Sequence, residues 1–254
     1  MFWVQNSRSV RTTVACVSVV FFLCLAGASG VLAQKKFSKT YPAGQSVRLQ
    51  LCNRTGTVTV EGWNREEVRI EATLEAPAAV IEPQSLSGVI VLNVAKDNQG
   101  RGDVGNVNFT IRVPYTTLVD IETKIGNLSV SNITSGLVRA HISSEGDITL
   151  MNIGAMNVSA ENVIGDIVFD GEIQEGGNYR FSSMRGNISL RIPFNASFRV
   201  VATAPSTRDI AFYQCASPAL SLLGDGRRMI GTCGSGSASL SVTNQRGGIR
   251  FYRR

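Results

Sequence analysis

Four glycines, each followed by Asn or Asp, recur at nearly equal spacing in the middle of this 254-residue chain. The pairs are Gly126-Asn127, Gly146-Asp147, Gly165-Asp166 and Gly186-Asn187, at separations of 20, 19 and 21 residues. If the pairs were stacked, their side-chain oxygens could bind a row of calcium ions. Calcium-binding coils use a denser GGxGxDxUx repeat, however, and it is absent here. We therefore expect structural corners, because glycine tolerates backbone angles that a Cβ disfavours, and Asn or Asp can hydrogen-bond to nearby backbone.

The residue types that usually catalyse reactions form no recognisable motif. His141 is the single histidine, and its place between Ala140 and Ile142 in an alternating run predicts an outward-facing side chain. The chain contains no GxSxG, HExxH or Walker sequence. We expect no catalytic residue, no metal ligand and no cofactor.

Three cysteines follow residue 33, and they point to one disulfide. Cys215 and Cys233 bracket a glycine- and arginine-containing segment and are the expected pair, which leaves Cys52 buried or free. Sequence alone leaves the other pairings open. No cysteine lies in a CxxC motif, so zinc binding has little support.

Residues 1–33 have the features of a secretory signal peptide. Two arginines precede an apolar run (14–25), and the small residues Val31 and Ala33 precede an expected cleavage point at Gln34. The run is shorter than the roughly 18–20 residues that span a bilayer, so we expect cleavage; an uncleaved membrane anchor is the alternative. The mature protein would be secreted, periplasmic or associated with the cell envelope, with no stable membrane span.

The mature chain carries only a small excess of positive charge, which disfavours nucleic acid as a partner but excludes little else. Without Arg8 and Arg11, basic residues exceed the 19 acidic residues by four, and they are scattered rather than clustered with aromatics. The expected partner is an unidentified envelope polymer or protein. Four arginines on predicted strands could form a basic stripe or be ordinary solvated positions. They are Arg139, Arg180, Arg191 and Arg199.

The elements that would hold the corners are short strands. Between glycines lie runs such as GDITL and GDIVF, whose period-two alternation predicts half-buried strands. A repeat of about 20 residues predicts a β-solenoid with two short strands per coil, in which stacked coils share one core. An antiparallel β-sandwich is the alternative. Residues 34–254 are expected to form a single β-repeat domain with irregular capping ends.

Two further sequence features allow more than one interpretation. Trp63 is expected to pack over the open end of the first coil, and a sugar-stacking platform is the alternative. Arg101-Gly102-Asp103 forms an RGD sequence in a polar loop, which chance explains more readily than receptor binding.

Three segments carry a resemblance to a known family. They are TGTVTVEGWNREEVRI (55–70), GNISLRIPFNASFRVVATAPSTRDI (186–210) and GSASLSVTNQRGGIRFYRR (236–254). In this order they resemble the bacterial DUF4097 family over about residues 37–254. The resemblance implies a β-solenoid-like fold, an exported or envelope-associated protein with an adhesin label, and no reaction. Arg208-Asp209 stands where the family usually has Gly-Asp, so we expect a less regular corner there.

The favoured functional interpretation is an exported, non-catalytic adhesin-like or structural binding module at the bacterial cell envelope. The alternative is a solenoid enzyme that acts on polysaccharide. Such an enzyme would gather three or more acidic or basic side chains in one groove.

Overall fold

The computed structural model describes residues 34–44, 47–212 and 218–254. Gln34–Arg254 forms one compact unit. The predicted signal peptide (1–33) and Cys215 lie outside the described residues, so both stay predictions.

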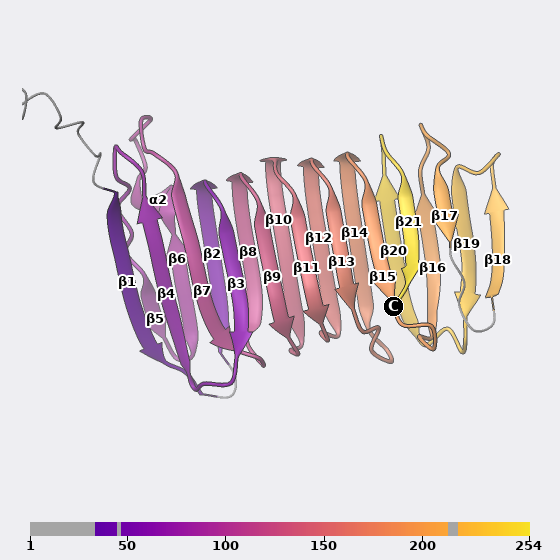
Figure 1. Ribbon diagram of the computed structural model, residues 1–254, viewed down its shortest axis with the longest axis horizontal. Helices are drawn as coiled ribbons and strands as arrows, with labels where there is room; N and C mark the ends of the chain where they lie inside the picture. The colour runs from indigo at the N-terminus through magenta and orange to yellow at the C-terminus, as the bar shows by residue number, and fades with distance from the viewer. Residues whose placement is uncertain (1–33, 45–46, 213–217) are drawn as a thin grey trace, which may run out of the picture. The chain divides into compact units, whose positions relative to one another are not determined.

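Two long sheets, here called A and B, make up the described unit (Figure 1). In spatial order, sheet A contains β1 (Lys35–Pro42), β4 (Glu67–Leu74), β7 (Val107–Pro114), β3 (Val58–Trp63), β9 (Leu128–Ile133), β11 (Ile148–Ile153), β13 (Ile167–Gly171), β15 (Ile188–Ile192), β21 (Ile249–Arg253) and β17 (Ile210–Phe212). Sheet B contains β18 (Pro218–Leu223), β19 (Arg228–Cys233), β16 (Phe198–Thr203), β20 (Ala238–Asn244), β14 (Asn178–Arg185), β12 (Asn157–Ile164), β10 (Leu137–Glu145), β8 (Leu118–Ile125), β2 (Arg48–Thr55), β6 (Val89–Asn93) and β5 (Gln84–Leu86). The helical element α2 (Val94–Asp97) follows β6.

Each central coil contributes one strand to each sheet, as the solenoid interpretation predicts. Successive coils pair in parallel, so that Ile148 lies opposite Leu128 on one side and Ile167 on the other. Antiparallel pairs occur among the described strands only at the two ends of the stack, among β1, β4 and β7, between β5 and β6, and among β16, β19 and β18. The prediction of an all-β solenoid is confirmed, and the antiparallel sandwich is wrong.

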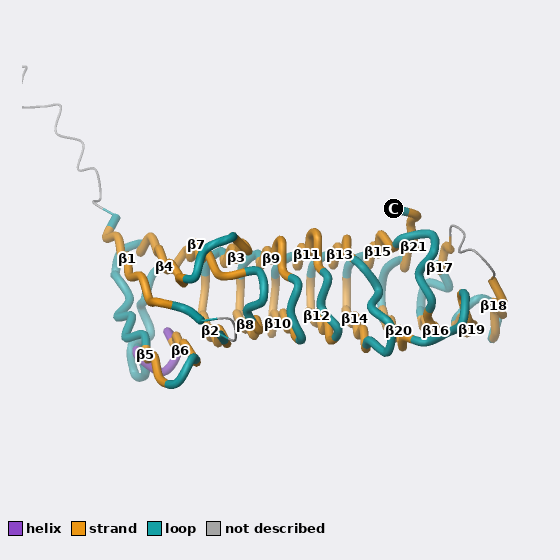
Figure 2. Tube along the Cα trace, turned by 90° about the horizontal axis from the view of Figure 1, so that it is seen from below, coloured by secondary structure: helices purple, strands orange, loops and turns teal. Residues whose placement is uncertain are grey.

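The core lies between the two sheets, which Figure 2 shows as two facing layers of strands. Ile148 and Leu150 of sheet A are fully buried, as are Val138 and Ile142 of sheet B. Thr149 on sheet A, and Arg139 and His141 on sheet B, point outward instead, because side chains alternate across a pleated strand. A single coil offers too little apolar surface to fold alone, so the stack buries one continuous core.

The coils do not follow one another strictly in chain order. The last coil, β20 and β21, is inserted between β14/β15 and β16/β17 (yellow strands in Figure 1). At the other end, β2 and β3 are inserted between β6/β7 and β8/β9. The inserted strands β2, β3, β20 and β21 therefore have hydrogen-bonded neighbours on both sides, which the sequence did not predict.

Candidate functional site

The corner glycines form a continuous row along one end of the strands. All have φ between +113° and +149°, a region that side chains rarely adopt. A Cβ at Gly165 would overlap the carbonyl oxygen of Gly146, and a Cβ at Gly186 would overlap that of Gly165. Glycine is therefore required for two reasons: the backbone angle, and the lack of room for a Cβ against the neighbouring coil. The row contains Gly56, Gly126, Gly146, Gly165, Gly186 and Gly247. The regular glycine spacing in the sequence predicts only the middle four.

The residue after each glycine links its coil to the next. The side-chain oxygen of Asn127 accepts a hydrogen bond from the backbone N–H of Asp147 at 3.0 Å, and Asp147 accepts from Asp166 at 2.8 Å. The ladder continues from Asp166 to Asn187 at 2.7 Å and from Asn187 to Gly248 at 3.0 Å. One oxygen of each side chain is thus occupied by a backbone amide, which accounts for the corner Asn and Asp without a cation.

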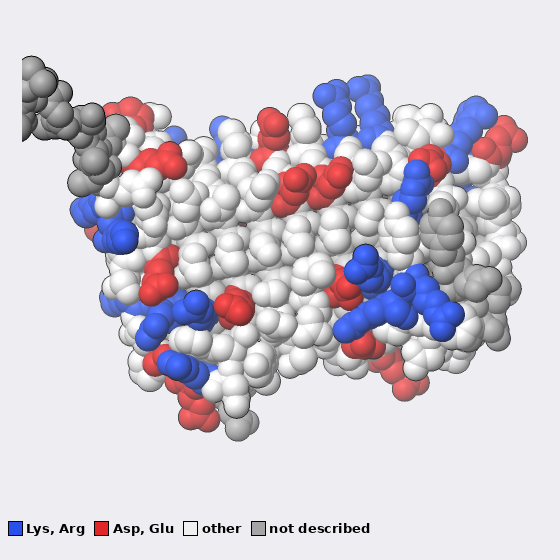
Figure 3. Space-filling view, viewed as in Figure 1, with Lys and Arg blue, Asp and Glu red and all other residues white. Residues whose placement is uncertain are grey.

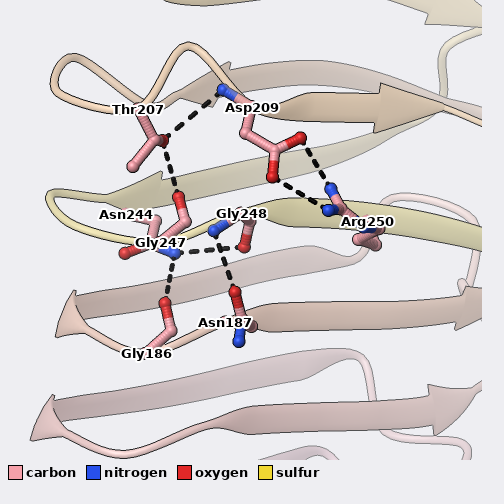
Figure 4. Close-up of polar contacts among 8 residues, drawn as sticks. All are labelled: Gly186, Asn187, Thr207, Asp209, Asn244, Gly247, Gly248 and Arg250. Atoms are coloured by element: carbon pink, nitrogen blue, oxygen red, sulfur yellow. Dashed lines mark hydrogen bonds and ion pairs between the residues drawn. The ribbon is translucent and has the colours of Figure 1, made fainter.

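A second, buried row of polar side chains supports the same corners from inside. Asn162 and Ser183 donate to the carbonyl oxygens of Gly146 and Gly165, at 3.2 and 3.4 Å. Asn244 donates to Gly186 at 2.8 Å, as the close-up in Figure 4 shows. These polar residues lie three positions before a corner glycine, a spacing in the sequence that the glycine pattern alone does not reveal. The corners are held from both sides and are structural.

The corner at Arg208-Asp209 differs from the regular glycine corners, as the arginine in place of glycine predicted. Arg208 has φ +58°. Asp209 makes a two-pronged ion pair with Arg250, both contacts at 2.8 Å (Figure 4). The hydrogen bond from Arg250 lowers the pKa of Asp209. An ion pair here replaces the side-chain-to-amide contact of the regular corners.

The outward face of sheet A carries a row of short hydroxyl side chains. Neighbouring strands place them in register across six coils, with Val168 as the one apolar member. The row consists of Thr110, Thr59, Ser129, Thr149, Val168 and Ser189. It forms an uncharged band across the face seen in Figure 3, between acidic corner residues above and mixed charges below.

Comparison with known proteins identifies the family. The profile of the Toastrack DUF4097 family matches residues 30–250. The chain belongs to this family. No curated protein matches the sequence.

Three solved structures align with most of this chain. A candidate cell adhesion protein from Clostridium sporogenes superposes with a TM-score of 0.52 at 10% identity, covering 87% of this chain and 100% of that one. A candidate adhesin from Bacteroides fragilis gives a TM-score of 0.41 at 14% identity, covering 88% and 99%. A candidate lipid-binding protein from Parabacteroides distasonis gives 0.33 at 8% identity, covering 87% and 97%. Only the first score exceeds 0.5, so it alone supports the shared fold.

The four strand arginines of this Toastrack chain do not form one basic stripe. Arg191 lies on sheet A and the other three on sheet B. Three of the four pair with an acid on a neighbouring strand. These pairs are Arg139–Asp120 at 3.0 Å, Arg180–Glu161 at 3.4 Å and Arg191–Asp170 at 3.4 Å. Cross-strand pairing largely neutralises this part of both faces.

Sheet B contains a shallow depression of about 200 Å³ that gathers charged side chains. Asp120 bridges Arg48 and Arg139 in it, at 3.1 and 3.0 Å. Cys52 and Glu122, on neighbouring strands, also line it. Cys52 is the free cysteine of the described residues. Burial, and to a lesser extent the charge of Glu122, raises the pKa of its thiol.

His141 lies on the strand next to Glu122, is half-buried, and is in register with Glu122 on one side and Glu161 on the other. Within the part of the chain that the structure describes, no three His, Cys, Asp or Glu side chains are arranged to hold a metal ion. None of the described helices has the length and apolar composition to cross a bilayer.

The expectation that Trp63 covers the open end of a coil is wrong. Its side chain lies on the outward face of sheet A, on the same side as Glu61, because Gly62 between them is the buried position. Its indole N–H donates to the carbonyl oxygen of Glu67 at 2.9 Å. Three guanidinium groups lie 4.9–5.9 Å from its ring centre, those of Arg65, Arg69 and Arg112. These contacts already occupy the aromatic surface that a sugar would need.

The arginine of the RGD sequence is anchored to the fold. Arg101 donates to the side-chain oxygen of Asn98 at 3.2 Å and to the carbonyl oxygen of Ala78 at 3.4 Å. Its own carbonyl oxygen accepts from Arg54 at 2.6 Å. The side chain that a receptor would have to recognise is thus engaged internally.

Proposed function

We propose that this protein is an exported, non-catalytic binding module of the bacterial cell envelope. The hydroxyl row of sheet A is the observation that carries the proposal. Its occupant would be an extended glycan-like envelope polymer. The adhesion-related descriptions of the structures at low identity agree with this interpretation but concern those proteins.

The spacing of the row suits a polymer rather than a small ligand. Adjacent strands lie about 4.8 Å apart, so the six strands from β7 to β15 spread the row over roughly 24 Å. Each hydroxyl can donate and accept a hydrogen bond, which matches the mixed donors and acceptors of a sugar chain. A flat, uncharged band also lets a neutral polymer approach without displacing an ion pair.

The direct test is co-sedimentation of the protein with purified peptidoglycan sacculi, chitin and cellulose. Thr149→Arg puts a bulky charge in the middle of the row and is expected to weaken binding at least ~10-fold, because several hydroxyl contacts would be blocked and each is typically worth about 1 kcal/mol. Ser241→Arg adds the same charge at an exposed position on sheet B and should leave binding unchanged. Equal loss in both variants, or no binding to any of the three polymers, would refute the proposal.

Export is tested separately. We expect the mature protein to begin near Gln34 and to be recovered from the periplasm or the culture medium after cell fractionation. N-terminal sequencing that finds residues 1–33 intact would instead indicate a retained anchor.

The depression on sheet B favours a second candidate function, a polysaccharide-acting enzyme. It brings together three charged side chains, Asp120, Glu122 and Arg139. Asp120 and Glu122 lie two residues apart on one strand face, about 6.6 Å by strand geometry, which is within the range of an inverting carboxylate pair. Against this, Asp120 already bridges two guanidinium groups. Release of reducing ends from a glycan, lost in both Asp120→Asn and Glu122→Gln, would establish the enzyme and displace the first proposal.

A further inference from the structure

One rim of the stack concentrates exposed arginines. It is the end at which strands of sheet B turn into strands of sheet A, and the arginines lie on the half nearest β18. We call them the basic rim: Arg185, Arg208, Arg227, Arg228 and Arg246, all exposed. Basic side chains project from the upper edge of the right half of Figure 3, where these turns lie.

The rim arginines differ from those on the sheets in having no acidic partner. Among the residues that the structure describes, most of the face arginines named above pair across strands, as Arg139 does with Asp120 and Arg191 with Asp170, although Arg199 does not. None of the five rim arginines takes part in an ion pair with another described residue. The acids at this half of the edge are Asp166, which accepts from the backbone N–H of Asn187, Asp209, which is held by Arg250, and Asp225 in the β18–β19 turn. The five arginines outnumber these three acids, so this half of the edge carries a net positive charge.

Large apolar side chains flank the basic rim on both sides. On one side, Met184, Val163 and Ile164 are 56%, 38% and 37% exposed. With Arg185 and Arg246 they line a mainly apolar depression of about 240 Å³. On the other side, Leu222 and Leu223 are 62% and 44% exposed.

The strand register places all of these side chains at the same end of the stack. Leu223 lies opposite Arg228, which lies opposite Thr203. Thr203 lies opposite Thr243, and Thr243 lies opposite Ser182, two residues before Met184. The arginines and the apolar side chains thus share one edge across six strands of sheet B.

We propose that this edge docks on the surface of a membrane that contains anionic phospholipid. Guanidinium groups bind phosphate with paired hydrogen bonds, and a negatively charged leaflet attracts clustered basic side chains. The flanking apolar side chains would insert among the lipid headgroups. A soluble polyanion has no comparable use for exposed Leu222 and Met184, and we therefore favour a membrane over a polymer.

Docking by this edge would leave both sheet faces free. The rim lies at the ends of the strands, whereas the hydroxyl row lies on the outward face of sheet A. A protein bound in this way would stand with its sheets upright on the membrane. The inference does not depend on the proposed glycan binding, because the two surfaces share no residue.

The test is flotation of the full mature chain with vesicles of phosphatidylglycerol and phosphatidylcholine, compared with vesicles of phosphatidylcholine alone. Each arginine near an anionic surface contributes roughly a factor of 5 to partitioning, so Arg185→Glu/Arg246→Glu is expected to reduce binding at least ~25-fold. Lys36→Glu/Arg199→Glu makes the same change in net charge at exposed positions away from the rim and should bind nearly as well as the wild type. Met184→Ser/Leu222→Ser should weaken binding while keeping the charge.

Three outcomes would overturn the inference. They are no preference for anionic vesicles, an equal loss in the rim and control variants, and full binding by Met184→Ser/Leu222→Ser combined with competition by soluble polyphosphate. The last outcome would assign the rim to a polyanion instead. Circular dichroism of each variant checks that the fold is retained, so a loss of binding can be attributed to the rim.

Discussion

Replacing Gly165 with alanine is expected to destabilise the fold far more than the same replacement at a glycine outside the corner row. Gly165 has φ +132°, and its Cβ would overlap the carbonyl oxygen of Gly146 in the coil below. Neither problem can be relieved locally, because hydrogen bonds to the next coil on either side fix the position of this backbone.

The magnitude follows from these two costs. A side chain forced into this backbone region costs about 1–3 kcal/mol, and an extra methyl group in filled space costs about 1–3 kcal/mol. We therefore expect a loss of about 4 kcal/mol in the free energy of unfolding. In a domain of this size, each kcal/mol lowers Tm by about 2–4 °C, so Tm should fall by roughly 8–16 °C.

Two control glycines separate the cost of the backbone angle from the cost of the Cβ overlap. Stability is measured by urea and thermal unfolding, followed by circular dichroism. Gly176 has φ +71° but nothing within 4 Å of its Cβ position, so Gly176→Ala should lose only about 1 kcal/mol from the backbone angle. Gly102 has open space and no positive φ, so Gly102→Ala should change stability by less than about 0.5 kcal/mol. If Gly165→Ala were no worse than Gly176→Ala, contact between stacked corners would not be what requires glycine.

Three further predictions test the polar contacts. Asp166→Ala removes the acceptor for a backbone amide of the next coil and should cost about 1–2 kcal/mol in urea unfolding, whereas Asp166→Asn should cost less because it keeps an acceptor. Arg250 lowers the pKa of Asp209, so this pair stabilises the fold at neutral pH, and its contribution is lost as pH falls through the lowered pKa. Asp209→Asn should therefore lower Tm at pH 7 by more than at pH 3, and its cost in the free energy of unfolding at pH 7 should stay below about 1 kcal/mol because the pair is partly exposed. Burial and Glu122 raise the pKa of Cys52, so iodoacetamide should alkylate Cys52 more slowly than a free cysteine, and Glu122→Gln should accelerate the reaction; an unchanged rate would show that Glu122 does not act on the thiol.

The sequence by itself determined the repeating part of the fold. The glycine spacing and the alternation in runs such as GDITL specify strand, corner and inward face, because these depend on local backbone angles and on a period of two. The corner roles of Asn127 and Asp147 could be inferred in kind, since short polar side chains favour turns. Their partner could not be inferred, because the amide that each oxygen accepts lies in the next coil, 19 to 21 residues away.

Only the tertiary structure decided what lies side by side at the ends and on the surfaces. The insertion of β20 between β14 and β16 depends on long-range strand pairing. The sequence does not specify this pairing, because each parallel strand edge offers similar hydrogen bonds and a similar pattern of side chains. Pairing also decided that Arg139 meets Asp120 while Arg185 and Arg246 meet no acid. A basic residue in a strand has the same appearance in the sequence whether a neighbouring strand neutralises it or leaves it exposed at a rim, because the neighbour is chosen by stacking rather than by local sequence.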